Sequence, residues 1–434
     1  MDKMADVLGR AGAWCGQNKY LSAIKNAFQN FMPLTIAGAI GVLWCNVLVN
    51  DQTGLGLFFK PIMALDFLNP AFQAVNFCTI SCITVGITLG IAQEIGVWNM
   101  GAERAGYIPG LVGLAAWLSV TNTSHMVDGA KEAFTGIAGN ELGATGLFTG
   151  MIIGVLSVEL FCFFEKQDAL KIKMPEQVPP GVARAFEVLV PATITLIITA
   201  CIGSACYNLT GLYLNDVIKN GIQGPLGAVG ATIPGVMIIY LVIMLFWLVG
   251  IHGNNMLSAV KEALFTPLAL ENVEAFNKHQ TPKNIINMYA LQMWGEFGGS
   301  GVTIGLVIAI MIFGKREDNK AIATLSLVPG LFNINETVTF GIPMVLNPIL
   351  GIPFVFACLV TIIVGYVLTV IGFCPVACLT VPWTTPPILF GFLATGANIM
   401  GGVTQAILIV VSTVIYTPFL IAYEKYQANQ AAEA

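Results

Sequence analysis

Charged side chains are scarce in this sequence. Of its 434 residues, 10% are Asp, Glu, Lys or Arg and 56% are hydrophobic. Soluble globular proteins carry about 25% charged residues, so this chain has too little polar surface to face water on all sides. The composition predicts an all-α polytopic membrane protein whose apolar helices face lipid.

The sequence also lacks the signatures of nucleic-acid and metal binding. Its net charge is −5 and its basic residues form no stripe, so we expect no nucleic-acid partner. The ten cysteines include no CxxC pair, and the three histidines, His125, His252 and His279, lie far apart. We therefore predict no metal and no cofactor, and we interpret the cysteines as small buried apolar side chains.

Charge-free stretches locate the membrane spans, because a spanning helix needs about 20 apolar residues. Five candidate spans lie in the first half, at 26–50, 67–93, 105–124, 142–165 and 188–215. The fourth contains Glu159, for which we predict a role between helices. Basic residues are dense before the first span and after the fourth, which places the N-terminus in the cytoplasm by the positive-inside rule. The two segments rich in basic residues contain Lys3, Arg10, Lys19, Lys25, Lys166, Lys171, Lys173 and Arg184. The loops after the first, third and fifth spans contain one basic residue each, Lys60, Lys131 and Lys219.

The second half is apolar but interrupted. Residues 321–423 contain one charged side chain, Glu336, and many Pro and Gly residues within apolar runs. Such breaks indicate discontinuous helices and re-entrant hairpins, which are tolerated at membrane depth where they are buried in protein or line a cavity. We expect about ten spans in all, with a scaffold of five plain spans in 1–215 and a substrate-binding domain in 216–434.

Glu336 is the strongest candidate for a functional residue. A charged side chain within a span costs at least ~2.5 kcal/mol, so it faces a protein interior or water. It follows Asn333 and Asn335, whose amides offer donors and acceptors for hydroxyl groups. Either Glu336 binds a polar substrate or carries a proton, or it caps a half-helix or pairs with a buried partner.

Five further residues complete the candidate substrate site. His252 and Asn254 lie in a glycine-flanked segment that suits a helix break lining a cavity, although a histidine satisfied at a helix end fits the same pattern. Trp247 and Trp383 are candidate platforms for sugar rings, or else tryptophans of the membrane interface. Glu296 precedes a GGSG turn at 298–301 and either faces the site or lies at the membrane surface.

Three motifs together resemble a known family. They are GIHGNN at 250–255, GGSG at 298–301 and NINE…FGIPMVLNP at 333–348. The combination resembles the membrane subunit, enzyme IIC, of bacterial sugar phosphotransferase systems, in the lactose/cellobiose/diacetylchitobiose branch. The resemblance extends over nearly the whole chain.

The resemblance implies a homodimer in the bacterial inner membrane, with an N-terminal dimerisation domain and a C-terminal transport domain. Two re-entrant hairpins of the transport domain would enclose a β-linked disaccharide and carry it across the lipid bilayer by an elevator motion. A cytoplasmic IIB phosphocarrier, supplied by IIA, would then phosphorylate the sugar. Glu336 would contact the reacting hydroxyl and assist as a base, and His252 would hydrogen-bond the sugar. Asn335 would help, and Trp247 and Trp383 would pack against the rings.

Two positions depart from the family pattern. Thr337 stands where the family usually has Pro, and Glu296 stands where an acidic residue is unusual. The sequence reaches Ala434 without a IIB or IIA domain, so we expect that it does not phosphorylate sugar alone.

Two other classes of function remain open. One is a proton-coupled secondary transporter that uses Glu336, although the second half shows one buried carboxylate and no evident partner cation. The other is a channel or a structural membrane subunit, which does not explain the clustering of Trp, His, Asn and Glu.

Overall fold

The computed structural model describes residues 10, 13–14, 17–51, 55–125, 134–175, 177–342 and 344–433. Lys3 and Lys131 of the topology prediction, Cys15 and Pro343 lie outside these residues. Helices dominate the described chain, and one short antiparallel hairpin pairs β1 (Ser124–His125) with β2 (Phe134–Thr135). Contacts divide the chain into two compact units: unit 1 contains Ala39–Ala74 and Ala228–Ala434, and unit 2 contains Gln17–Gly38 and Val75–Gly227.

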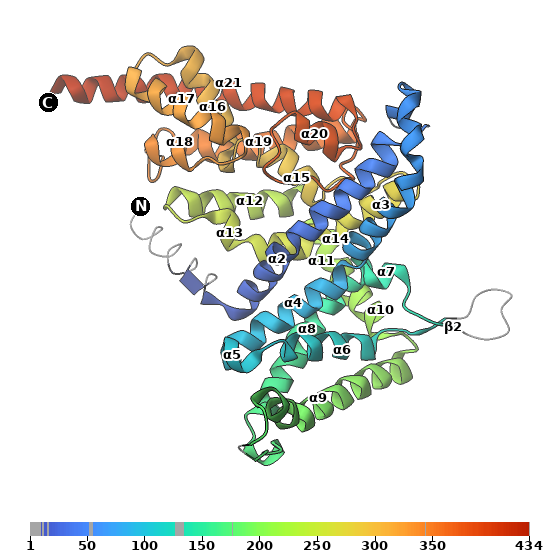
Figure 1. Cartoon of the computed structure of the whole chain (residues 1–434). Helices are drawn as coiled ribbons and strands as arrows, with labels where there is room; N and C mark the ends of the chain where they lie inside the picture. Colours follow the sequence, from blue (N-terminus) through green and yellow to red (C-terminus); the bar gives the residue numbers. More distant parts are fainter. Residues whose placement is uncertain are drawn as a thin grey trace. The chain divides into compact units, whose positions relative to one another are not determined.

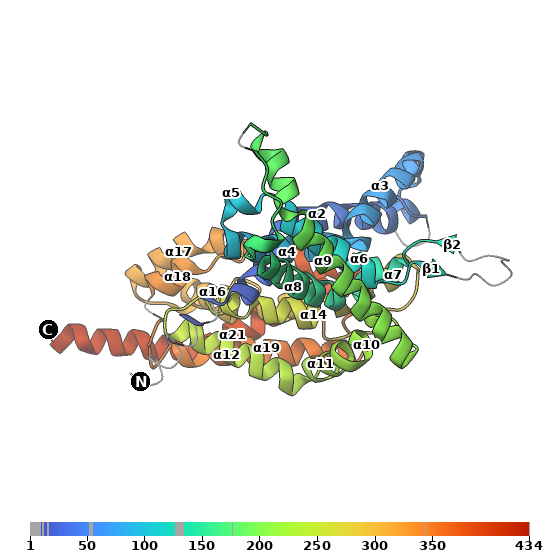
Figure 2. The ribbon, with the colours of Figure 1, turned by 90° about the horizontal axis from the view of Figure 1, so that it is seen from below.

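Unit 2 is a bundle in which α4, α6 and α8 lie side by side (Figures 1 and 2). Small residues allow this close approach, as in many membrane helix pairs. A Cβ atom on Gly150 of α8 would lie 2.2 Å from the Thr88 hydroxyl of α4, and one on Gly113 of α6 would lie 2.3 Å from the Cβ of Ala92. The unit contains most of α2 (Lys19–Leu43), α4 (Ile83–Met100), α5 (Ala102–Ala105), α6 (Ile108–Val120), α7 (Gly139–Leu142), α8 (Ala144–Glu165), α9 (Pro180–Thr210) and α10 (Leu214–Ile218).

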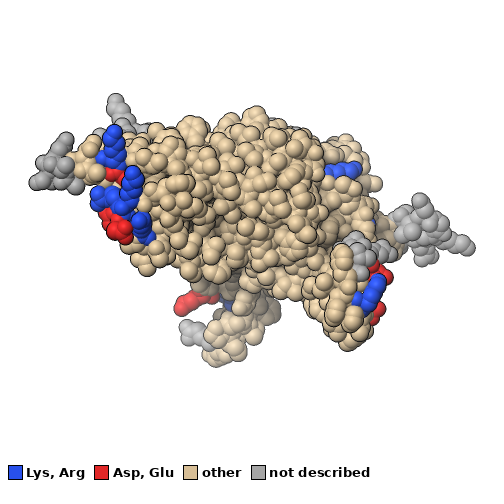
Figure 3. Space-filling view, turned by 90° about the horizontal axis from the view of Figure 1, so that it is seen from above, with Lys and Arg blue, Asp and Glu red and all other residues tan. Residues whose placement is uncertain are grey.

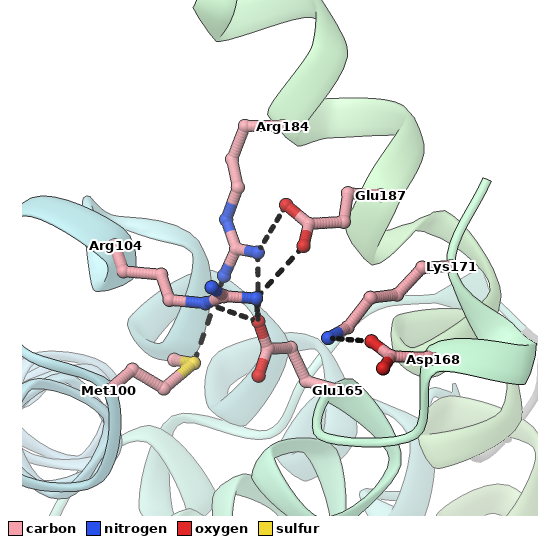
Figure 4. Close-up of polar contacts among 7 residues, drawn as sticks. All are labelled: Met100, Arg104, Glu165, Asp168, Lys171, Arg184 and Glu187. Carbon is pink, nitrogen blue, oxygen red and sulfur yellow. Dashed lines mark hydrogen bonds and ion pairs between the residues drawn. The ribbon is translucent and has the colours of Figure 1, made fainter. Parts of the chain in front are cut away.

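Several charged side chains of unit 2 form ion pairs. Glu159 of α8 forms an ion pair with Lys19 of α2 at 2.6 Å, which is the kind of contact between helices that the sequence predicts. In a second cluster, Arg104 and Arg184 both contact Glu165, at 2.8 and 2.9 Å, and both contact Glu187, at 2.9 Å (Figure 4). This cluster joins α5 and the end of α8 to the start of α9.

The connector between α8 and α9 contains one 3₁₀ turn, Asp168–Leu170. Within it, Lys171 donates a hydrogen bond of 2.9 Å to Asp168, and this bond lowers the pKa of the exposed carboxyl (Figure 4). Lys171 of the connector therefore makes a local contact.

Unit 1 contains the interrupted half of the chain. In it, α16, α19 and α20 all pack against the long helix α21 (Figure 1). Its elements are the last turns of α2 with a π-helical extension (Trp44–Leu48), 3₁₀ turns at Leu55–Leu57 and Lys60–Leu68, most of α3 (Asn69–Asn76), the end of α11 (Gly224–Gly230), α12 (Ile233–Leu248), α13 (Gly253–Met256), α14 (Ser258–Asn277), α15 (Met288–Gly295), a 3₁₀ turn (Ser300–Val302), α16 (Ile304–Phe313), α17 (Glu317–Leu331), α18 (Glu336–Gly341), α19 (Gly351–Val370), α20 (Leu389–Ala394) and α21 (Ile399–Glu433).

Apolar side chains stay exposed on the long helices of unit 1. On α19 they follow one helical stripe, at Ile352, Phe356, Ile363 and Val367. Figure 3 shows a broad face with almost no charged atoms, which lie at its margins. A large exposed apolar surface of this kind suits contact with lipid rather than water.

Five helices of the described chain are long and apolar enough to cross a membrane, and seven spans result if two bent pairs each count once. The predicted second span, 67–93, is not one plain helix, because it breaks at Cys82 between Lys60–Ser81 and Ile83–Met100. The third is shorter than predicted, since α6 has 13 residues. The total of about ten spans stays a prediction.

Buried amide side chains hold the irregular backbone between α19 and α20. Asn272 and Asn287 both donate to the carbonyl of Ala377, at 3.0 and 3.1 Å. The Gln405 carbonyl oxygen accepts from the backbone N–H groups of Ile388 and Gly391, both at 2.8 Å. Because no water is present in the bilayer core to satisfy freed backbone groups, these amides make the break possible.

Candidate functional site

The turn from α12 into α13 places Trp247 beside His252. Their ring centroids lie 4.5 Å apart, and Trp247 is only 3% exposed. His252 is the N-cap of α13, and its Nδ1 accepts the backbone N–H of Asn255 at 3.3 Å. In the neutral ring, Nδ1 is therefore the acceptor and Nε2 carries the proton, so the free edge of His252 is a hydrogen-bond donor.

The GGSG turn lies against this segment. Asn254 donates to the Ser300 hydroxyl at 3.2 Å, and Asn335 donates to the Ser300 carbonyl at 2.8 Å. Gly298, Gly299 and Gly301 all have positive φ, a conformation that favours glycine. The turn therefore connects α13 to the segment that contains Asn335 and Glu336.

Asn333 ties the same turn to the loop before α20. Its oxygen accepts the Gly298 N–H at 2.6 Å, and its nitrogen donates to the carbonyls of Trp383 and, at 3.2 Å, Thr385. Asn333 itself has a φ of 64°, a left-handed conformation that Asn adopts more readily than most residues. The predicted site residue Asn333 thus uses its amide to hold protein backbone, as Asn335 does.

Glu336 begins α18 and is exposed. It has no hydrogen bond or ion pair with any residue that the structure describes, so the predicted alternative of a buried partner is not realised there. The Glu336 charge acts on the imidazole of His252, which links the two predicted catalytic residues electrostatically. Trp383 is 44% exposed and joins the network through its backbone carbonyl.

Two polar atoms of the site are buried without a partner among the described residues. They are the indole nitrogen Nε1 of Trp247 and the amide oxygen Oδ1 of Asn254. Buried polar groups are normally hydrogen-bonded, so a polar molecule bound beside these two residues would meet one donor and one acceptor.

Glu296 has a buried partner that the sequence did not reveal. Its Oε1 accepts from the Tyr240 hydroxyl at 2.6 Å and forms an ion pair with Lys261. The second half therefore contains a paired carboxylate and a buried cation, which corrects the prediction of one buried carboxylate with no partner cation. Lys261 lies 35 residues from Glu296 in sequence, so no local pattern predicts the pair.

Comparison with known proteins decides the family. The model of the family "Phosphotransferase system, EIIC" matches residues 25–358. The chain belongs to the EIIC family of the phosphotransferase system. This result confirms the resemblance carried by the GIHGNN, GGSG and NINE motifs, and it makes the EIIC chain a multi-pass membrane protein.

Individual relatives cover almost the whole EIIC chain. The oligo-beta-mannoside-specific EIIC component of Bacillus subtilis is 33% identical over all of this chain and 96% of its own length. The cellobiose-specific EIIC component of Lactococcus lactis is 29% identical over 98% of both chains. The crystal structure of the transporter ChbC, the IIC component of an N,N'-diacetylchitobiose-specific system, superposes with a TM-score of 0.88, at 30% identity and 97% coverage of both chains.

The departure at Thr337 fits the EIIC fold. Thr337 lies in the first turn of α18, where a proline would fit equally well because the N–H groups of a first turn lack acceptors within the helix. The fold of α18 thus gives no reason for a loss of function at this position.

The cysteines of the EIIC chain differ in part from the prediction. Cys162, Cys358, Cys374 and Cys378 are buried as expected. Cys78 and Cys201 are instead exposed, on helices where an apolar surface faces outward. Within the described residues, no group of three or more His, Cys, Asp or Glu side chains is arranged to hold a metal ion.

Proposed function

We propose that this EIIC chain binds a β-linked disaccharide, such as cellobiose, within unit 1 and presents it for phosphorylation by a IIB phosphocarrier. The observation that carries the proposal is the Trp247–His252 pair, fixed against the GGSG turn through Asn254. An aromatic ring beside directed donors and acceptors is suited to a sugar, which has apolar ring faces and hydroxyl edges. The names of relatives that transport cellobiose and oligo-β-mannosides support the choice of substrate class.

Each proposed role follows from local geometry. The Nε2–H of His252 would donate to a sugar hydroxyl because Nδ1 is occupied by Asn255. Glu336, exposed and without a partner among the described residues, would accept a hydrogen bond from the hydroxyl to be phosphorylated and assist as its base. Trp247 and Trp383 would contact the sugar rings.

A relative supports the proposed partner. The lactose-specific component of Streptococcus mutans is an EIICB component; it is 31% identical to this chain, and the match covers 96% of this chain and 71% of that protein. We infer that the present chain works with a IIB phosphocarrier, supplied by IIA.

The larger arrangement is proposed on the family resemblance. Residues 1–215 would form the dimerisation scaffold and 216–434 the transport domain, which moves as an elevator in a homodimer in the bacterial inner membrane. The N-terminus would face the cytoplasm. Cross-linking of cysteine pairs introduced across the dimer and across the moving surface tests these points.

The test of the site is a binding screen with purified protein. Cellobiose, lactose, diacetylchitobiose and monosaccharides are titrated against the wild type, Glu336→Ala and His252→Ala. We expect each substitution to weaken disaccharide binding about tenfold or more. Glu336→Ala removes the carboxylate that accepts a hydrogen bond from a sugar hydroxyl, and His252→Ala removes the Nε2–H that donates one. The matched control is Glu317→Ala, which removes an exposed carboxylate at the start of α17. Unchanged affinity in both site variants would disprove the proposed site.

A proton-coupled secondary transporter remains the competing function, and the unpartnered Glu336 is the observation in its favour. In that case Glu336→Gln abolishes pH-driven accumulation of free sugar in proteoliposomes but keeps sugar exchange. A phosphotransferase permease shows no pH-driven accumulation before or after the substitution.

A further inference from the structure

We propose that the Lys261–Glu296 pair selects the sugar: it favours disaccharides with free hydroxyl groups over those that carry N-acetyl groups. The inference rests on the proposed function, since it concerns the same sugar site. It assigns a specificity role to Glu296 and a positioning role to Lys261.

The pair is built into the wall of unit 1 from three helices. Glu296 directly follows α15, Lys261 belongs to α14 and Tyr240 to α12. The side chains of Lys261 and Glu296 are 7% and 17% exposed. Tyr240 donates to Oε1 at 2.6 Å, and the Lys261 ammonium lies 5.4 Å from the centroid of the Tyr240 ring. The carboxylate is thus fixed in place by two donors.

One oxygen of this carboxylate remains for a ligand. Among the described residues, every hydrogen bond to the Glu296 side chain ends on Oε1. A carboxylate has about four lone-pair sites on two oxygens, so Oε2 is an acceptor without a donor. Because the side chain is not fully buried, a bound molecule can supply that donor.

The position of Glu296 relates it to the sugar site. Its backbone carbonyl accepts the N–H of Gly299 at 3.1 Å, so Glu296 starts the turn whose Ser300 contacts Asn254. The charges of Glu296 and Lys261 both act on the His252 imidazole. The carboxylate therefore lies within electrostatic range of the residue that we propose to bind the sugar.

The chemistry of a fixed carboxylate gives it a preference. An ionised carboxylate only accepts hydrogen bonds, and a sugar hydroxyl can donate one to Oε2. An acetamido group in place of that hydroxyl also has a donor, its N–H, but this N–H is flanked by a sugar carbon and a planar acetyl group, so it cannot approach Oε2 as closely or from as many directions as a hydroxyl can. The acetyl group is also bulkier, and it removes water from the carboxylate without replacing the hydrogen bonds of that water. A site arranged to bind a hydroxyl rejects analogues that lack it.

Lys261 is a positioning residue in this arrangement. It pairs with Glu296, so the carboxylate is not left as an uncompensated charge in a wall with little access to water. Tyr240 sets the direction of the carboxylate by holding Oε1. Removal of Lys261 leaves the acceptor without its counter-charge, whereas removal of both charges leaves a neutral wall.

The test compares two sugars on five proteins. The dissociation constants of cellobiose and N,N′-diacetylchitobiose are measured by calorimetry for the wild type, Glu296→Gln, Lys261→Met and the double variant, with Glu317→Gln as the control. We expect Glu296→Gln to weaken cellobiose binding by about tenfold to 100-fold, the size of a charge-assisted hydrogen bond, and to leave diacetylchitobiose binding unchanged or tighter. The double variant should show the same loss of selectivity, and it covers the case in which either single variant fails to fold.

The outcomes separate this inference from the proposed function. If the wild type binds cellobiose but the ratio of the two affinities is the same in Glu296→Gln and the double variant, the pair is structural and the specificity role is wrong, while the proposed function stands. If the wild type binds neither disaccharide, the proposed function is wrong as well. A change in the ratio that occurs equally in Glu317→Gln also overturns the specificity role.

Discussion

Gly301 provides a sensitive test of how the site is held together. It has φ 75° and ψ 10°, and a Cβ atom there would lie 2.4 Å from the ring of Phe354. Phe354 is buried and packs edge-on against Trp247 at a centroid distance of 6.5 Å. An alanine at position 301 therefore pushes on Trp247, the proposed sugar platform.

The chain supplies a matched control for this change. Gly211 ends α9 with φ 71° and ψ 6°, nearly the same backbone conformation, but a Cβ atom there meets nothing within 4 Å. Left-handed backbone costs an alanine about 1–2 kcal/mol, of which roughly 0.4–1 kcal/mol is offset by the reduced entropy of the unfolded chain. Gly211→Ala should thus cost about 1 kcal/mol or less. Gly301→Ala should cost about 2–4 kcal/mol, because overpacking adds roughly 1–3 kcal/mol.

Thermal unfolding in detergent and calorimetric sugar binding measure both effects. We expect Gly301→Ala to lower the unfolding midpoint clearly more than Gly211→Ala. We also expect it to weaken disaccharide binding several-fold, while Gly211→Ala leaves binding unchanged. Equal midpoints in the two variants, or wild-type affinity in Gly301→Ala, would refute the packing of the turn against Phe354 and Trp247.

Three further changes test separate parts of the structure. Asn333→Ala removes one accepted and two donated hydrogen bonds, each worth about 1 kcal/mol. It should therefore destabilise the protein by about 2–3 kcal/mol in the same unfolding assay. Wild-type stability would contradict the role of Asn333 in connecting the GGSG turn to the loop before α20. Glu165→Ala leaves Arg104 and Arg184 without their shared, 3% exposed partner and should cost about 1–3 kcal/mol, given that both arginines are partly exposed. An unfolding midpoint that does not fall would show that Glu187 alone neutralises them. Incubation with EDTA should leave the calorimetric affinity for disaccharides unchanged, because we predict no metal in the site.

Composition and hydropathy pattern predicted the class of the protein because the surroundings of a protein, lipid or water, determine how many apolar and charged side chains its surface carries. A chain with 10% charged residues has to expose apolar surface, and the stripe of α19 shows that surface. The breaks in the second half were also predictable, since Pro and Gly within apolar runs end helices. The break at Cys82 was not, because the stretch 67–93 contains no charge and no Gly or Pro near that point except Gly86 and Gly90.

The site was predictable where its residues are close in sequence. His252 and Asn254 share one short segment, and Asn333, Asn335 and Glu336 share another. Their partners come from distant segments: Asn333 reaches a carbonyl 50 residues away, and Gln405 reaches Met293 across 112 residues. Such contacts depend on tertiary packing, which leaves no periodic signal in the sequence. This is why the hydrogen bonds from amide side chains to distant backbone, and the partner role of Lys261, became visible only in the structure.

Uptake by proteoliposomes tests the central claim most directly. Vesicles containing the purified EIIC chain are given radiolabelled cellobiose with and without a complete phosphocarrier chain that ends in a cognate IIB protein. We predict that the lumen gains sugar phosphate when the carriers face the cytoplasmic side of the protein, and that no sugar is concentrated without them. Accumulation of free cellobiose against its gradient in the absence of the carriers would contradict a phosphotransferase permease.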